Sequence, residues 1–146
     1  MPSNVTDALL KQKSQNFDLE TIFRLSLHDV GLSTADGVLN ECTSLRSLDL
    51  SKNRITEVNE LDGSALSRLE ELDLSSNRLD SLRSFPEIPS LLRLQLQENK
   101  LATLNDVCSV LAKKCPDLQL LWLQDASGKH GNPVCGLPNY RAQVHT

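Results

Sequence analysis

The chain has 146 residues, a length that suits a single domain. Hydrophobic residues make up 39% of it but aromatic residues only 3%, so leucine must form most of the core, which favours a repetitive architecture. A formal net charge of −4 at pH 7 argues against a protein that binds nucleic acid mainly by electrostatic attraction.

The first 21 residues differ from the rest of the chain and predict a helical cap at one end of the domain. They lack a basic start followed by an apolar core, so we do not expect a secretory signal peptide. No apolar run approaches the roughly 18 residues that span a bilayer. A short helix is expected over residues 4–13, and the apolar residues available for the cap are Val5, Leu9, Leu10, Phe17, Leu19 and Ile22.

From residue 22 onward the chain repeats itself. The segments 22–32, 45–55, 69–79 and 91–101 follow the pattern L-x-x-L-x-L-x-x-N-x-L, with Ile22 and Val30 as departures in the first. Residues 118–128 form a fifth copy with Ala126 at the asparagine position. The alternation L-x-L predicts a short strand with one buried face. Because each copy turns back before the next, the strands should stack in parallel. The pattern therefore predicts an α/β fold, a short curved solenoid of about five repeats with a concave parallel sheet.

The asparagines of the pattern are predicted to be structural. Asn53, Asn77 and Asn99 each follow a strand at a sharp turn. Their amide groups can bond the backbone N–H and C=O groups that such a turn would otherwise leave without partners in the core.

The segments between strands are short, so the convex side should be mostly irregular or 3₁₀. The last of them, LNDVCSVLAKKCPDL, is longer and predicts a helix capped by Asn105 or Asp106 that ends before Pro116. Its apolar face is formed by Val107, Val110 and Leu111.

The domain is expected to span residues 1–146, with an N-terminal cap at 1–21, repeats at 22–125 and a C-terminal cap at 126–146. Tyr140 and Val144 are four residues apart, as at the start of a helix. Less than two turns of that helix would fit, so the C-terminal cap is either truncated or thin.

The repeats resemble those of the intracellular leucine-rich-repeat proteins whose repeats have about 22 residues. NPVCGLPNYRAQV is similar to the C-terminal cap shared by the U2 small nuclear ribonucleoprotein A-prime proteins, the acidic nuclear phosphoproteins and the outer-arm dynein light chain 1 proteins. In those proteins a short L-P-x-L segment and an acidic residue usually follow, and here that continuation is missing. LLKQKSQNFDLETIFRLSLHDVGL is similar to the N-terminal segment of the leucine-rich repeat-containing protein 61 family.

This resemblance implies the fold and an intracellular, cytoplasmic setting, but no chemistry. The dynein light chain points to the cilium or flagellum as one such setting, a cytoskeletal location is another, and the nucleus stays open.

The residue types that carry chemistry do not form a recognisable set. The histidines are His28, His130 and His145, and no phosphate-binding, metalloprotease or serine-hydrolase motif is present. Cys108 and Cys115 are seven residues apart, but no histidine follows at zinc-ligand spacing. We therefore expect free thiols, no metal, no cofactor and no enzymatic activity.

The side chains that alternate with the strand leucines should line the concave face. Its predicted middle is acidic, basic residues flank it, and its C-terminal end is apolar. The candidate contact residues are Arg24, His28, Asp49, Glu71, Asp73, Arg93, Gln95, Leu120, Trp122 and Gln124. Asp49 and Asp73 are interpreted as a solvated acidic patch rather than a catalytic pair, because no apolar pocket that would perturb a pKa is evident.

Trp122 is the only tryptophan, and it stands where the other repeats have small polar residues. With Leu120 it is either an anchor for a partner, such as a helix laid in the groove, or it is covered by residues 126–139 or by residues beyond Thr146. Arg54, Arg78 and Lys100 form a second strip, either a binding edge for phosphate or an acidic partner, or simply solvated turn positions.

These observations predict a non-catalytic protein-interaction module, monomeric in isolation, that binds another protein through a helix or a basic segment. Direct binding of nucleic acid or membrane is not expected. The alternative is a subunit of a larger assembly: a ribonucleoprotein subunit like the A-prime protein, a regulatory subunit of a phosphatase, or a subunit of an axonemal or ciliary dynein-type complex.

Overall fold

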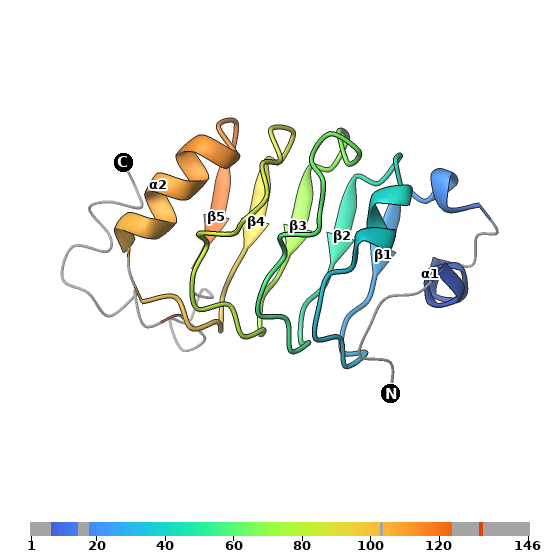
Figure 1. Ribbon diagram of the computed structural model, residues 1–146, viewed down its shortest axis with the longest axis horizontal. Coiled ribbons are helices and arrows are strands. Elements are labelled where there is room, and N and C mark those ends of the chain that lie inside the picture. The colour runs from blue at the N-terminus through green and yellow to red at the C-terminus, as the bar shows by residue number, and fades with distance from the viewer. Residues whose placement is uncertain (1–6, 15–17, 103, 124–131, 133–146) are drawn as a thin grey trace.

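A computed structural model describes residues 7–14, 18–102, 104–123 and 132 (Figure 1). One parallel sheet contains five strands of three residues each, in chain order: β1 (Arg24–Ser26), β2 (Ser47–Asp49), β3 (Glu71–Asp73), β4 (Arg93–Gln95) and β5 (Leu120–Trp122). Figure 1 shows the strands side by side, with the return segments on one side of the sheet. The predicted solenoid of about five repeats is confirmed.

Stacked leucines hold the strands in register. Leu25, Leu48, Leu72 and Leu94 are aligned in β1 to β4, and none is more than 4% exposed. Burying a leucine side chain stabilises the folded chain by about 1.5–3 kcal/mol. A layer of leucines that recurs in every strand can therefore stabilise a core that has few aromatic residues. Leu121, the counterpart in β5, is only half-buried.

The asparagines form one continuous hydrogen-bonded ladder, as predicted for Asn53, Asn77 and Asn99. The Nδ2 group of Asn77 donates to the carbonyl of Leu74 in its own repeat and to that of Leu50 in the preceding repeat, both at 3.0 Å. Its Oδ1 accepts the backbone N–H of Ile55 at 3.0 Å. Asn53 and Asn99 make the equivalent bonds, so each shared carbonyl accepts from two successive asparagines.

The fifth repeat corrects the sequence alignment. The ladder position assigned to Ala126 is taken by Asn132, which is 5% exposed. Asn132 Nδ2 donates to Leu96 O at 2.6 Å and Leu123 O at 2.9 Å, and its Oδ1 accepts Leu101 N–H at 3.1 Å. The rung that ends the ladder therefore lies nine residues after its leucine instead of three.

Helices close one end and cover part of the convex side. Helix α1 (Asp7–Ser14) lies beside β1 with Leu10 fully buried, close to the predicted span of 4–13. Helix α2 (Leu104–Lys114) precedes β5, with Val107 and Leu111 buried. It begins at Leu104, so the predicted caps Asn105 and Asp106 lie inside its first turn and the cap prediction is wrong.

The remaining returns are irregular or 3₁₀, as predicted, and the 3₁₀ segments are η1 (Leu19–Thr21) and η2 (Gly37–Glu41). Two local features constrain the backbone between the strands. A Cβ atom at Gly63 would lie 1.9 Å from the carbonyl oxygen of Glu87 in the next repeat, so only glycine fits there. The residues that precede Val30, Asn53, Asn77 and Asn99 adopt a left-handed conformation with φ between 54° and 56°; they are Asp29, Lys52, Ser76 and Glu98.

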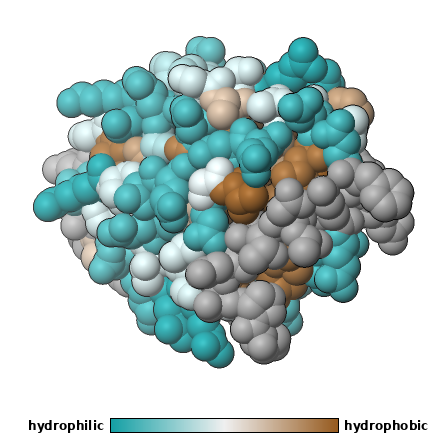
Figure 2. Space-filling model, turned by 45° about the vertical axis from the view of Figure 1, so that its right-hand side comes forward, coloured by the Kyte–Doolittle hydropathy of each residue, from teal (hydrophilic) through white to brown (hydrophobic). Residues whose placement is uncertain are grey.

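Within the described part of the chain, no helix is long and apolar enough to cross a membrane. Figure 2 shows a face on which hydrophilic residues predominate, with hydrophobic side chains in separate areas. The predicted helix at Tyr140 and Val144 lies outside the described residues, as does most of the predicted cap at 126–146.

Candidate functional site

The register of the sheet arranges the concave side chains in two rows that cross all five strands. The first row consists of Arg24, Ser47, Glu71, Arg93 and Leu120. The second consists of Ser26, Asp49, Asp73, Gln95 and Trp122. Neighbouring strands lie about 4.8 Å apart, so a ligand that crosses the sheet meets a new side chain in each row at every step. Of the predicted contact residues, Gln124 lies outside the described part of the chain.

The acidic centre is held in place by a motif that recurs in two repeats. Asp49 Oδ1 accepts hydrogen bonds from the backbone N–H of Ser51 at 2.9 Å and from its hydroxyl at 2.5 Å. Asp73 makes the same pair of bonds with Ser75, at 2.9 and 2.6 Å. Each carboxylate is therefore oriented before any partner arrives, which lowers the entropy cost of a charged contact.

His28 extends this motif along the sheet. Its Nδ1 lies 2.6 Å from Ser51 Oγ, and Ser51 is 5% exposed. Because the Ser51 hydroxyl donates its proton to Asp49, Nδ1 of His28 must carry the proton in their hydrogen bond, which leaves Nε2 as the free ring nitrogen. The order His–Ser–Asp differs from that of a serine hydrolase, in which histidine takes the proton of the serine. The trio therefore orients side chains and provides no nucleophile.

The C-terminal end of the face is apolar and partly open. Leu120 is 44% exposed and Trp122 is 37% exposed. Trp122 borders a hollow of about 200 Å³ whose wall also includes Asp49, Asp73 and Gln95. The anchor candidate and the acidic centre thus share one recess. Covering of Trp122 by residues 126–139 lies outside the described residues.

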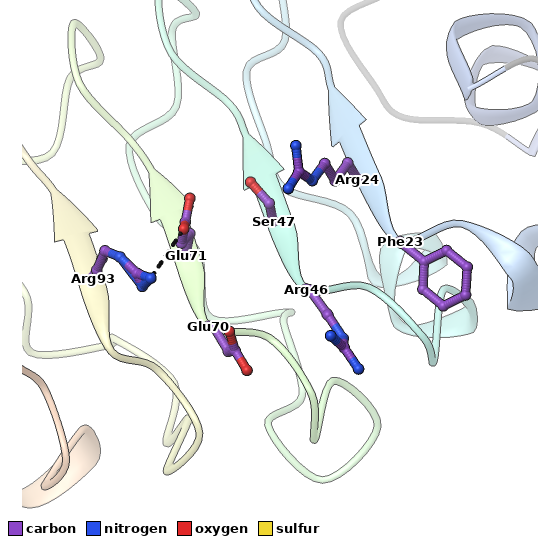
Figure 3. A pocket seen from close by; sticks show the side chains of 7 residues that line it. All are labelled: Phe23, Arg24, Arg46, Ser47, Glu70, Glu71 and Arg93. Carbon is purple, nitrogen blue, oxygen red and sulfur yellow. Dashed lines mark ion pairs between the residues drawn. The ribbon is translucent and has the colours of Figure 1, made fainter.

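A second, larger hollow lies at the amino ends of the strands. It has a volume of about 540 Å³ and is lined by Phe23, Arg24, Arg46, Ser47, Glu70, Glu71 and Arg93 (Figure 3). Phe23, Arg46 and Glu70 were missed by sequence reasoning, because each stands just before its strand, where alternation does not say which way a side chain turns. Phe23 is 56% exposed, the most exposed large hydrophobic residue of the described chain.

Neither hollow has the features of a catalytic or metal centre. Among the described residues, no group of three or more histidines, cysteines or carboxylates is placed to hold a metal ion. Cys42, Cys108 and Cys115 form no disulfide within the described part of the chain. Burial raises the pKa of Cys115 to about 11, so this thiol is protonated and unreactive at neutral pH.

The repeats, the asparagine ladder and the parallel sheet agree with a comparison against known families. The leucine rich repeat family matches residues 23–79 and 43–101, which together cover more than half of the chain. The chain belongs to this family. Leucine-rich repeat proteins generally mediate protein–protein interactions, and the fold is generally a non-enzymatic interaction module.

Two curated relatives are much longer than this chain. An uncharacterized leucine-rich repeat-containing protein of Schizosaccharomyces pombe is 33% identical over 89 residues, covering 61% of this chain and 14% of its own length. Tubulin-specific chaperone E of Pongo abelii is 34% identical over 129 residues, covering 81% of this chain and 23% of its own length. The chain therefore spans less than a quarter of the length of either relative.

Solved structures show the same architecture. A chain of the SNF/U2A′ complex of Drosophila melanogaster superposes with a TM-score of 0.73 at 24% identity, covering 96% of this chain and 76% of that one. Internalin C2 of Listeria monocytogenes gives a TM-score of 0.55 at 22% identity, covering 77% of this chain and 60% of the internalin. At such identities the likeness concerns the fold alone.

Proposed function

We propose that the chain is a non-catalytic interaction module that binds a partner protein on the concave face of its sheet. One observation carries the proposal: Trp122, still 37% exposed, borders the same hollow as the oriented carboxylates of Asp49 and Asp73. Exposed aromatic residues in recesses are the usual anchors of protein interfaces. Fixed carboxylates beside the anchor select which partners are admitted.

The chemistry of the recess defines the partner segment that fits it. An apolar side chain would lie against Trp122 and Leu120, and a lysine or arginine nearby would face Asp49 and Asp73. Hydrogen bonds to Ser51 and Ser75 use one oxygen of each carboxylate, Oδ1. Among the described residues no donor bonds Oδ2 of Asp73, so that oxygen is available to a cation of the partner.

The test is affinity capture from the native cells, read by quantitative mass spectrometry, with wild type beside Trp122→Ala and Asp73→Lys. Asp80→Lys is the matched control, because Asp80 is exposed and lies after the ladder turn, away from the hollow. Proteins bound by wild type and by Asp80→Lys should be lost with both test variants, provided that circular dichroism shows these to be folded. Unchanged binding of every partner to both would show that the concave face is not the interface.

A second candidate is a subunit of a larger assembly. It is favoured by the superposition on a chain of a complex, SNF/U2A′, and by the relative named tubulin-specific chaperone E. Sucrose-gradient sedimentation of a native lysate would distinguish the two functions. An assembly subunit sediments in one discrete large complex, whereas a module with exchangeable partners spreads over several.

Three finer points belong to the same proposal: a position within the leucine-rich repeat-containing protein 61 family, a cytoplasmic location, and a monomeric state in isolation. The location is tested by imaging the tagged protein in its native cells, where exclusive nuclear or ciliary staining would contradict it. The monomer is tested by light scattering, which should give 16.2 kDa.

A further inference from the structure

The hollow at the amino ends of the strands has a chemistry opposite to that of the recess at Trp122. Three of its lining residues are arginines, and the walls of the recess contain only one of them, Arg93. Figure 3 shows Arg24 extending toward Ser47 on the neighbouring strand, while Arg46 hangs from the edge just before β2. Phe23 borders the hollow on the side of β1.

The three arginines are not equivalent. Arg93 Nη2 lies 3.4 Å from Glu71 Oε1, so this guanidinium is already neutralised by the neighbouring strand. Among the described residues, Arg24 and Arg46 have no ion pair. Glu70 is the remaining carboxylate of the wall, and it has no ion pair within the same part of the chain. The β1–β2 side of the hollow therefore offers two guanidinium groups and an exposed aromatic ring.

Resting on the proposed function, we propose that this hollow is a subsite for a carboxylate-bearing segment of the partner protein, with an apolar side chain against Phe23. Guanidinium groups pair with carboxylates, as they do with phosphates, through two parallel hydrogen bonds. The concave face would then bind its partner in one orientation. The acidic part of the partner lies over β1 and β2, its basic part over Asp49 and Asp73, and its apolar part at β5.

Charge and shape favour a protein segment over other anions. A polyphosphate backbone that reached Arg24 and Arg46 would also approach Glu70 and Glu71, and beyond them Asp49 and Asp73, all of which repel it. A flat bilayer cannot enter the concave side of a sheet. A peptide can alternate charges to match the face, whereas a nucleic acid carries a phosphate at every step.

The experiment uses two defined peptides and ¹H–¹⁵N correlation spectra of the whole chain, which is small enough for residue-level mapping and sensitive to millimolar binding. The acidic probe is acetyl-Glu-Glu-Phe-Glu-Glu-amide, and the basic probe is acetyl-Lys-Lys-Phe-Lys-Lys-amide. We expect the acidic probe to shift the amides of Arg24, Arg46 and Ser47. The basic probe should instead shift those of Asp49 and Asp73 and change the fluorescence of Trp122.

Variants make the assignment specific. The double variant Arg24→Glu/Arg46→Glu should weaken the acidic probe about tenfold or more while leaving the basic probe unchanged. Glu71→Gln should strengthen the acidic probe by a few fold, because it releases Arg93. Arg68→Glu, at an exposed arginine that does not line the hollow, is the matched control and should change neither probe.

The outcomes separate this inference from the proposed function. Shifts centred on Arg54, Arg78 and Lys100, or a double variant that binds the acidic probe normally, would overturn the subsite while leaving the recess at Trp122 in place. A uridine oligonucleotide that shifts the same amides at lower concentration than the acidic probe would overturn the choice of a protein segment. Failure of the basic probe together with unchanged capture by Trp122→Ala would instead sink the proposed function.

Discussion

Replacing Asn77 with alanine tests whether the asparagine ladder works as a chain of shared bonds. In the folded protein Asn77 accepts the N–H of Ile55 and donates to the carbonyls of Leu50 and Leu74. The N–H of Ile55 would lose the only partner that it has among the described residues, at a cost of about 1–3 kcal/mol for a buried donor left without a hydrogen bond. The two carbonyls would each lose one bond but keep another, from Asn53 and Asn99 respectively. Each loss costs about 0.5–1 kcal/mol.

The sum predicts that Asn77→Ala lowers the free energy of unfolding by roughly 2–5 kcal/mol. Asn53→Ala should cost more, because Asn53 accepts from both Val30 and Leu32 and is the only described donor to Leu27 O. Asn40→Ala is the matched control. Asn40 also bonds two backbone groups, Glu60 O and Asp62 N, but at an exposed site where water can replace it. We expect it to cost less than about 1 kcal/mol.

The assay is urea unfolding followed by far-ultraviolet circular dichroism and by the fluorescence of Trp122. Coincidence of the two transitions would show that the repeats unfold together, which the free-energy comparison requires. A cost for Asn77→Ala no larger than that for Asn40→Ala would refute the ladder as a source of stability. An Asn53→Ala variant that is more stable than Asn77→Ala would refute the counting of shared carbonyls, and would mean that the first repeat relaxes around its lost bonds.

Three further predictions concern stability. Gly63→Ala should destabilise the fold by about 1–3 kcal/mol or more in urea unfolding, because its Cβ would meet Glu87 O at 1.9 Å, whereas Gly37→Ala, with its nearest contact at 3.8 Å, should have little effect; equal costs would contradict this. Lys52→Gly should stabilise the chain by up to about 1 kcal/mol relative to Lys52→Ala, since φ at this residue is 56°, and a less stable glycine variant would refute the strain. Burial raises the pKa of Cys115 from 9.0 to about 11. Between these two pH values the thiol therefore keeps its proton in the folded chain and loses it in the unfolded chain. The stability advantage of wild type over Cys115→Ala should therefore be full below pH 9 and decline toward pH 11 in pH-dependent thermal melts, and a constant advantage would refute it.

The fold could be predicted because its physical cause is periodic. Each repeat contributes the same buried leucines, so a pattern of spacing determines strands, register and the asparagine ladder together. The prediction failed where the period is interrupted. Leu123 and Asn132 are separated by nine residues, and a fixed template places Ala126 at the rung. Counting polar groups would have found the error, because alanine cannot satisfy the carbonyls of Leu96 and Leu123 and an amide had to come from elsewhere.

The candidate site was predictable only in part, for a related reason. Side chains inside a strand alternate, so Asp49, Asp73 and Trp122 could be assigned to the concave face from sequence. Phe23 and Arg46 precede their strands, and the direction of their side chains depends on the turn that leads into each strand. The pairing of Arg93 with Glu71 was equally hidden, although the register that causes it follows from the repeat.

Under this proposal, the two hollows account for the positions of the two exposed aromatic side chains of the described residues, Phe23 before β1 and Trp122 in β5. Phe23 lines a hollow with two guanidinium groups that have no ion pair among the described residues, and Trp122 lines a hollow with the fixed carboxylates of Asp49 and Asp73. Arg93 and Glu71 line both hollows and form an ion pair with each other, so their charges largely cancel. A partner bound in the reverse direction would place its apolar part beside Arg24 and Arg46 and its acidic part beside Leu120 and Trp122, so the charged groups at both ends would lose their partners. Selection of the partner's orientation in this way needs no conformational change. It follows from the residues that each repeat places within its strand and just before it.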